Sequence, residues 1–166
     1  MIKLRQMAAA FLFNGEEVLM MKRSPERELA PGLWAPVGGH LEPHEMSQPR
    51  SACLREIKEE TGITEAKLTD FKLKYIILRQ KESEIRLQYI FFGNSQVRFV
   101  TITEEGELYW KNKTEVLELK MATTTRFVLE HYFETGAKEE DVFVGTLGDL
   151  AGSPSINWAP LRDWEN

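Results

Sequence analysis

Three glutamates, Glu56, Glu59 and Glu60, follow Arg55 within one short stretch of the chain. If this stretch is helical, residues three and four apart are neighbours, so the three carboxylates share one helix face. Carboxylates held this close repel one another unless a positive charge lies among them. A hard divalent cation such as Mg²⁺ fits, because it binds carboxylate, water and phosphate oxygens. Arg55 can pair with one carboxylate and fix its orientation. The spacing therefore predicts a cation site, and the alternative interpretation of this pattern alone is a solvated acidic helix face.

A helix over Pro49–Thr61 is needed to hold these carboxylates. Ser47 or Gln48 can cap its start, Pro49 suits the first turn and Gly62 suits the stop. Cys53 and its apolar neighbours fall on a different face, which we expect to pack on a sheet.

The rest of the chain alternates strand and helix patterns. Asn14-Gly15 predicts a hairpin turn, because both residues tolerate positive φ. The stretch Thr123–Thr135 predicts a second helix that stops at Gly136, and Thr114–Leu119 a short one. The tail Ala151–Asn166 shows no clear periodicity. The strand candidates are Gln6–Phe13, Val18–Lys22, Leu33–Val37, Phe71–Arg79, Glu84–Phe92, Gln96–Ile102, Glu107–Trp110 and a segment from about Asp141 to Thr146.

Length and composition bound the possibilities. The chain has 166 residues, which predicts one α/β (α+β) domain over 1–166, with 151–166 as a C-terminal tail. Its one cysteine excludes an internal disulfide and a zinc site of four cysteines. The net charge of −5, without a Lys/Arg block, argues against binding long nucleic acid, although a metal would allow a small phosphorylated ligand.

No apolar run approaches the ~20 residues that span a bilayer. The first residues are better explained as a strand than as a signal peptide. We therefore expect a cytoplasmic protein without membrane contact, and both a monomer and a homodimer stay open.

The acidic stretch extends into a longer motif. Gly39, five residues, Glu45 and then the segment REIKEETGI (Arg55–Ile63) resemble the Nudix box, G-x5-E-x7-R-E-U-x-E-E-x-G-U, where U is bulky and aliphatic. Every specified residue is present. Nine residues, Met46–Leu54, replace the usual seven, and we assign the two extra ones to the loop near Ser47–Pro49. The resemblance spans about residues 3–145 and implies an α/β/α sandwich with a mixed β-sheet.

The resemblance also implies an activity, the hydrolysis of a nucleoside diphosphate linked to another moiety X. The cofactor it implies is Mg²⁺, with Mn²⁺ as an alternative. Carried over by position, the carboxylates of Glu56, Glu59 and Glu60 bind the metal together with the backbone carbonyl of Gly38, while Arg55 orients the glutamates and Glu45 supports the loop.

A general base is also required, since a carboxylate must accept the proton of the attacking water. The loop around Glu105, just before Tyr109-Trp110, resembles the loop that supplies the base in MutT-type enzymes. We choose Glu105 over Glu104. The alternatives are that this loop is only an exposed acidic turn, or that Glu59 or Glu60 is the base.

The stretch Gly32–Pro36 before the glycine pair resembles MutT-type nucleoside triphosphate pyrophosphatases, which release a nucleoside monophosphate and pyrophosphate. By that analogy the segment Met121-Ala122-Thr123-Thr124 lies near the base pocket, with Met121 and Thr123 as the predicted substrate contacts. The segment lacks the Asn or Asp that reads guanine, which weakens an oxidised-guanine assignment.

Further substrate contacts are predicted at Arg23, which can reach a phosphate, at Trp34, which can stack on a base, and at Gly39, where the backbone can approach closely. Each has an ordinary alternative: a strand-end arginine for Arg23 and a core tryptophan for Trp34.

Other functions compete with this one. Nucleotide-sugar, dinucleotide and pterin triphosphate pyrophosphatases use similar chemistry. A non-catalytic nucleotide-binding regulator is the alternative from another class. The complete set of Arg55, Glu56, Glu59 and Glu60 favours hydrolysis, since such regulators often lose box carboxylates.

Overall fold

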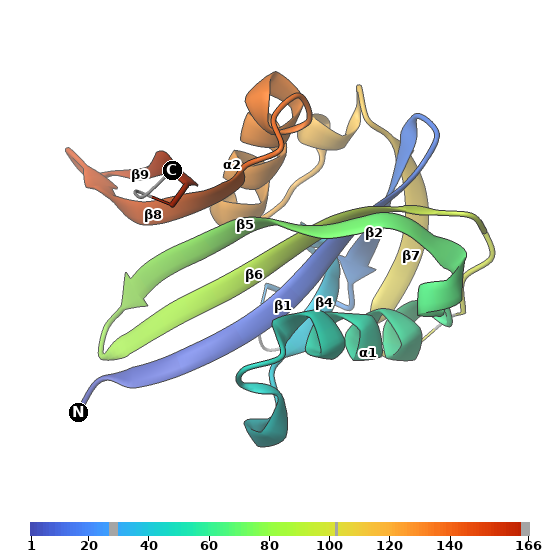
Figure 1. Ribbon diagram of the computed structural model, residues 1–166, viewed down its shortest axis with the longest axis horizontal. Helices are drawn as coiled ribbons and strands as arrows, with labels where there is room; N and C mark the ends of the chain where they lie inside the picture. The colour runs from blue at the N-terminus through green and yellow to red at the C-terminus, as the bar shows by residue number, and fades with distance from the viewer. Residues whose placement is uncertain (27–29, 102, 164–166) are drawn as a thin grey trace.

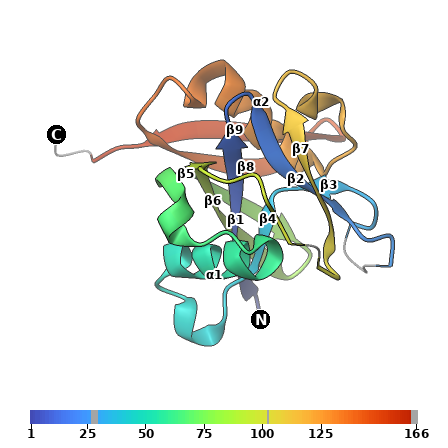
Figure 2. The same ribbon diagram turned by 90° about the vertical axis from the view of Figure 1, so that its right-hand side faces the viewer.

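A mixed sheet lies at the centre of the protein, with α1 (Pro49–Thr61) on one face and α2 (Thr123–His131) on the other (Figures 1 and 2). The computed structural model describes residues 1–26, 30–101 and 103–163. Within them the strand order is β3-β2-β1-β6-β5-β8-β9, with β4 paired to β1 and β7 paired to β2. The strands are β1 Lys3–Asn14, β2 Glu17–Arg23, β3 Trp34–Ala35, β4 Val37–His40, β5 Leu68–Lys81, β6 Glu84–Ser95, β7 Gly106–Asn112, β8 Val142–Leu150 and β9 Ser153–Leu161. The short helices are the 3₁₀ turns η1 Pro43–Glu45, η2 Glu65–Lys67 and η3 Val116–Glu118, and the π-helix η4 Tyr132–Gly136. This α+β sandwich confirms the predicted fold class.

The first strand is the organising element of the sheet. It pairs in parallel with β6 along nearly its whole length and antiparallel with β4 between Met7 and Ala10. Successive side chains point to opposite faces. Ala8 and Ala10 therefore join the core beneath α1, whereas Phe11 joins the core beneath α2. The strand thus carries β4, and with it the glycine pair, next to α1.

The carboxylate-bearing helix forms where the sequence predicts it. It begins after Gln48, the second of the two candidate caps, and ends at Gly62, whose φ of 77° is left-handed. The Gly62 N–H donates to the Lys58 carbonyl at 2.9 Å. Cys53 and Ile57 are fully buried against the sheet, so the opposite side of the helix faces outward.

Several other boundaries differ slightly from those predicted. The hairpin loop is Gly15-Glu16, because Asn14 still pairs with Glu17. The strand expected over Leu33–Val37 is divided at Pro36 into β3 and β4, since proline has no N–H for the ladder. The second helix continues to Gly136, but its last turn is a π-helix.

Two predictions, one of a strand and one of a tail, were wrong. No strand forms over residues 96–101 of the predicted Gln96–Ile102, and Ile102 lies outside the described residues. Val97 and Val100 pack instead on the core beneath α1, and the Thr101 N–H donates to the Thr61 carbonyl at 2.9 Å. Their apolar pattern reflected burial without strand pairing.

The tail is the second error. Within the predicted C-terminal tail, 151–166, residues 153–161 form β9, which pairs antiparallel with all of β8. Pro154 and Pro160 argue against a strand when only the sequence is considered, but β9 is an edge strand, and an edge strand tolerates proline. The ring of Trp158 packs on Tyr75 and His131, with centroid distances of 5.2 and 4.6 Å.

The two main helices, α1 and α2, are short. No helix among the described residues is long and apolar enough to cross a membrane.

Because Trp158 ties β9 to the core, we expect Trp158→Ala to lower the free energy of unfolding by about 1–3 kcal/mol, less than for a fully buried tryptophan. The neighbouring, exposed Asn157 provides the control, and Asn157→Ala should stay near wild type. Chemical denaturation measures both. Equal stabilities of the two variants would contradict a packing role for β9.

Candidate active site

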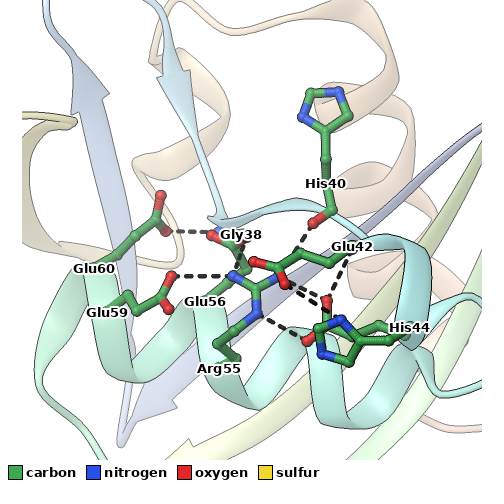
Figure 3. A network of polar contacts seen from close by, with 9 residues as sticks. Gly38, His40, Glu42, His44, Arg55, Glu56, Glu59 and Glu60 are labelled. Atoms are coloured by element: carbon green, nitrogen blue, oxygen red, sulfur yellow. Dashed lines mark hydrogen bonds and ion pairs between the residues drawn. The ribbon is translucent and has the colours of Figure 1, made fainter.

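The guanidinium of Arg55 holds three of the acidic side chains together (Figure 3). Arg55 donates from Nε and Nη2 to the two carboxylate oxygens of Glu45, both at 2.8 Å. Its Nη1 donates to Glu56 Oε1 at 2.8 Å and to Glu59 Oε2 at 3.0 Å, and its Nη2 also donates to the His40 carbonyl at 3.2 Å. Arg55 therefore fixes three carboxylates and the end of β4 at once.

The contact with Glu45 anchors this network. Glu45 is 6% exposed and also accepts the Glu42 N–H at 3.0 Å. The hydrogen bonds from Arg55, and then that from Glu42, lower the pKa of Glu45 from 4.5 to about 2, so it is a fixed anion. The same contact raises the pKa of Arg55. The longer spacing between Glu45 and Arg55 thus leaves their pairing intact, and the additional residues are accommodated between η1 and α1.

The carboxylate of Glu60 lies apart from Arg55. Its Oε2 accepts the Gly38 N–H at 2.7 Å, and the residue is 7% exposed. Burial raises the pKa of Glu60 to about 8, and the charges of Glu56 and Glu105 add to this effect. Burial likewise raises the pKa of Glu56. These carboxylates are therefore short of positive charge, as expected of cation ligands.

The two glycines of β4 allow this close packing. Gly38 has a φ of +146°, and a Cβ there would lie 2.3 Å from the Ala8 carbonyl oxygen. A Cβ on Gly39 would lie 2.6 Å from Glu56 Oε1. Any larger residue would displace β4 from β1 or from Glu56. The Gly38 N–H binds Glu60, and the metal contact predicted for its carbonyl stays a prediction.

An open groove of about 880 Å³ runs over these residues. It brings together most of the predicted site, although its parts come from β2, β4, α1 and the loop before β7. Glu104 and Glu105 both line it, Glu105 half-buried and Glu104 exposed. The predicted residues along the groove are Arg23, Gly38, Gly39, Arg55, Glu56, Glu59, Glu60 and Glu105.

A smaller cavity of about 150 Å³ adjoins the groove and shares Met7, Arg23 and both glycines with it. Its walls are mostly apolar. The polar side chains of Gln88, Thr124 and Thr125 also line it. Thr124 belongs to the segment Met121–Thr124 that the resemblance placed near the base pocket, whereas Gln88 and Thr125 were not predicted. The alternating pattern of β6 shows that Gln88 is polar but does not show which face of the sheet it occupies.

Three predicted substrate contacts line neither space. Trp34 and Met121 form a parallel bridge, and both pack on the core beneath α2. The Lys111 ammonium also lies 4.9 Å from the centroid of the Trp34 ring. Because side chains alternate, the next residues, Ala35 and Ala122, face the cavity instead. Thr123, at the start of α2, is exposed and lies beside Thr124.

The donors suit a hard cation, although they are not pre-assembled. Among the described residues, no three or more His, Cys, Asp or Glu side chains converge on a single metal position. Mg²⁺ needs only one or two carboxylates, since waters and substrate phosphates complete its shell. The oxygen donors along the groove therefore fit such an ion.

Replacing Glu45 tests the anchor. We expect Glu45→Gln to lower the free energy of unfolding at pH 7 by about 1.5–3 kcal/mol, the usual range for a hydrogen bond to a charged group. Because the pKa of Glu45 falls from 4.5 to about 2 on folding, its stabilisation is complete above pH 4.5 and is lost as the pH falls toward 2. Wild type and variant should therefore converge in acid.

Urea titrations at several pH values measure this difference. The control is Glu65→Gln, which removes only an exposed ion pair with Arg50 and should have little effect. A loss for Glu45→Gln that is independent of pH would contradict the anionic anchor.

Comparison with known proteins shows the family of the chain. The model of the NUDIX domain family matches residues 3–140. CTP pyrophosphohydrolase of Escherichia coli K12 is 28% identical over 138 residues, which cover 79% of this chain and 93% of that protein. Nucleoside triphosphatase NudI of Escherichia coli O9:H4 is 30% identical over 134 residues, 75% of this chain and 94% of that protein.

Solved structures share the fold. A MutT protein from Bacillus halodurans superposes with a TM-score of 0.72 at 23% identity, over 93% of this chain and 97% of that one. A NUDIX hydrolase from Nitrosomonas europaea has a TM-score of 0.69 at 15% identity, over 88% of this chain and 80% of that one. With the box residues gathered around Arg55 and the family match along most of its length, the chain belongs to the Nudix family and is a pyrophosphohydrolase.

Proposed function

We propose that the protein hydrolyses nucleoside triphosphates to a nucleoside monophosphate and pyrophosphate, with Mg²⁺ or Mn²⁺ as cofactor. The observation that carries the proposal is the groove of carboxylates joined to a small, largely apolar cavity. Phosphates and cation suit the groove, and a base suits the cavity. The similarity to a CTP pyrophosphohydrolase and to a nucleoside triphosphatase supports this substrate class.

We assign metal binding to the carboxylates of Glu56, Glu59 and Glu60, with the carbonyl of Gly38 as a further donor. When bound, the cation neutralises the diphosphate, lowers the pKa of a water molecule and orients in-line attack on phosphorus. Arg55 holds Glu56 and Glu59 in place, and Gly38 holds Glu60 through its N–H. The ligands therefore start from fixed positions on one helix face.

Glu105 is our choice of general base, which accepts the proton of the attacking water. It lines the groove, is half-buried and is close enough for its charge to act on Glu56 and Glu60. Its backbone carbonyl accepts the Ser24 N–H at 3.3 Å, which ties the loop to the end of β2. Glu104 is more exposed and lacks this electrostatic link among the described interactions.

The nucleotide is bound on the side of the groove that adjoins the cavity. Arg23 lines both the groove and the cavity, so it suits a phosphate near the sugar. Gly39 leaves room for close backbone approach. Trp34, Met121 and Thr123 act in this proposal as support for the cavity wall. A cytoplasmic location and a monomeric or homodimeric state stay predictions.

We expect turnover to require a divalent cation. Purified protein is assayed with Mg²⁺ against triphosphates, oxidised triphosphates, sugar nucleotides and dinucleotides, and both products are identified. Activity on triphosphates should disappear in excess chelator and return with Mg²⁺ or Mn²⁺. Full turnover of metal-free protein, or a preference for sugar nucleotides, would overturn the proposal.

The helix carboxylates provide a second test. Glu56→Gln or Glu60→Gln should lower kcat by about 10²–10⁴ and weaken the metal dependence, because each variant loses a cation-binding charge. The fold should persist, since relief of like-charge repulsion offsets the change. Glu65→Gln, on an exposed surface, is the matched control. Fully active Glu56→Gln and Glu60→Gln variants would rule out this metal site.

The base is tested by a separate pair of variants. Glu105→Gln should lower kcat by about 10²–10⁴ while the metal concentration for half-maximal activity stays nearly constant. Glu104→Gln, one residue away in the same loop, should keep most of the activity. The measurement is a metal titration with a pH–rate profile for each variant. If Glu105→Gln retains wild-type kcat, the proton is accepted elsewhere.

A further inference from the structure

A group of basic side chains lies on the sheet beyond the substrate cavity. The strand register places Arg5 of β1 opposite Arg86 of β6, and Arg86 opposite Arg79 of β5. Cross-strand partners project from the same face of a sheet. Three arginines from three strands therefore stand side by side, although they are far apart in the sequence.

The next row of the sheet continues the pattern. Lys3 and Lys81 both lie opposite Glu84. We call these five cationic residues, Lys3, Arg5, Arg79, Lys81 and Arg86, the distal basic patch.

Glu84 partly neutralises this patch. Its two carboxylate oxygens accept from Arg5 Nε at 3.0 Å and from Arg86 Nε at 2.5 Å. Among the described residues, no other carboxylate forms an ion pair with the patch. One acidic side chain thus balances five cations, in a chain whose net charge is −5. Like charges directly opposite each other on a sheet are destabilising, so an anionic ligand bound at the patch would reduce this repulsion.

The patch is continuous with the proposed substrate site. Met7 and Gln88, which line the cavity, lie two residues from Arg5 and Arg86 on the same strands and the same face. Two strand residues span about 7 Å. The patch therefore begins one side-chain step along the strands from the wall of the cavity.

The patch is also accessible. The pairing of β8 with β5 ends at Leu78↔Thr146, so β8 does not pair with Arg79 or Lys81, and both side chains are exposed. In Figure 1 this is the end of the sheet near the N-terminus, beyond α1 and α2. The side chain of Arg5 is 41% exposed, while that of Arg86 is 17% exposed and forms the floor.

We propose that the distal basic patch binds a second phosphate group, carried by the nucleotide whose base occupies the cavity. The substrate class is then a nucleoside 5′-triphosphate that bears a further phosphate on its sugar. Guanidinium groups suit this ligand, because they bind phosphate with paired hydrogen bonds. The inference rests on the proposed function, since it places the base and the 5′-phosphates as described there.

The test compares two probes that contain no anhydride to hydrolyse, cytidine 3′,5′-bisphosphate and cytidine 5′-monophosphate, by calorimetric titration with Mg²⁺. We expect wild type to bind the bisphosphate about tenfold more tightly, with the advantage shrinking at high salt. The double variant Arg5→Gln/Arg79→Gln should lose the advantage and bind the monophosphate within twofold of wild type. The matched control Lys67→Gln removes an exposed lysine of η2 and should keep it.

Inorganic phosphate is titrated in parallel to separate a tethered group from a free anion. The inference is overturned if the bisphosphate has no advantage, if the advantage survives in the double variant, or if inorganic phosphate alone binds at the patch as tightly as the bisphosphate. Cytidine triphosphate hydrolysis by wild type is assayed separately. Absent hydrolysis of any triphosphate would overturn the proposed function, whereas normal hydrolysis without a bisphosphate advantage would overturn only this inference.

Discussion

The pairing of the half-buried Arg55 with the buried Glu45 is the contact on which the site depends. It joins α1 to the turn after β4, and the same guanidinium reaches two more carboxylates of the helix. The side chain of Arg55 is only 24% exposed, and a charge largely removed from water needs partners, because an uncompensated charge is costly inside a protein. The arginine therefore sets the rotamers of Glu56 and Glu59 before any ligand arrives. Glu60, which it does not reach, is held by the backbone of Gly38.

This arrangement leaves the acidic groups under-neutralised. Arg55 makes two of its hydrogen bonds to Glu45, while burial and the charges of neighbouring glutamates raise the pKa values of Glu56 and Glu60. A fold without a ligand to bind would gain stability by placing apolar groups there. The cost is instead concentrated along one groove, which is the pattern expected where a protein must bind a cation and phosphates.

Local signals predicted much of this site. The helix over Pro49–Thr61, its stop at Gly62 and the shared face of the glutamates all depend on residues within four positions of one another. Predictions that depended on residues distant in the sequence were wrong. The apolar pattern over residues 96–101 indicated burial but not pairing, and β9 needed a partner strand to outweigh its prolines. Met121 was assigned by position in a segment, whereas alternation turned its neighbour Ala122 toward the cavity.

Strand register explains why the distal basic patch is not evident from the sequence. The sequence has no cluster of lysine and arginine, yet β1, β5 and β6 each contribute every second residue to one face, and their register aligns those positions. The same alternation that places Met7 and Gln88 at the cavity places Arg5 and Arg86 one step further along. An acidic helix and a basic sheet end thus flank one substrate site. Their opposite charges suit a ligand that carries phosphate at both ends, with a cation needed at only one of them.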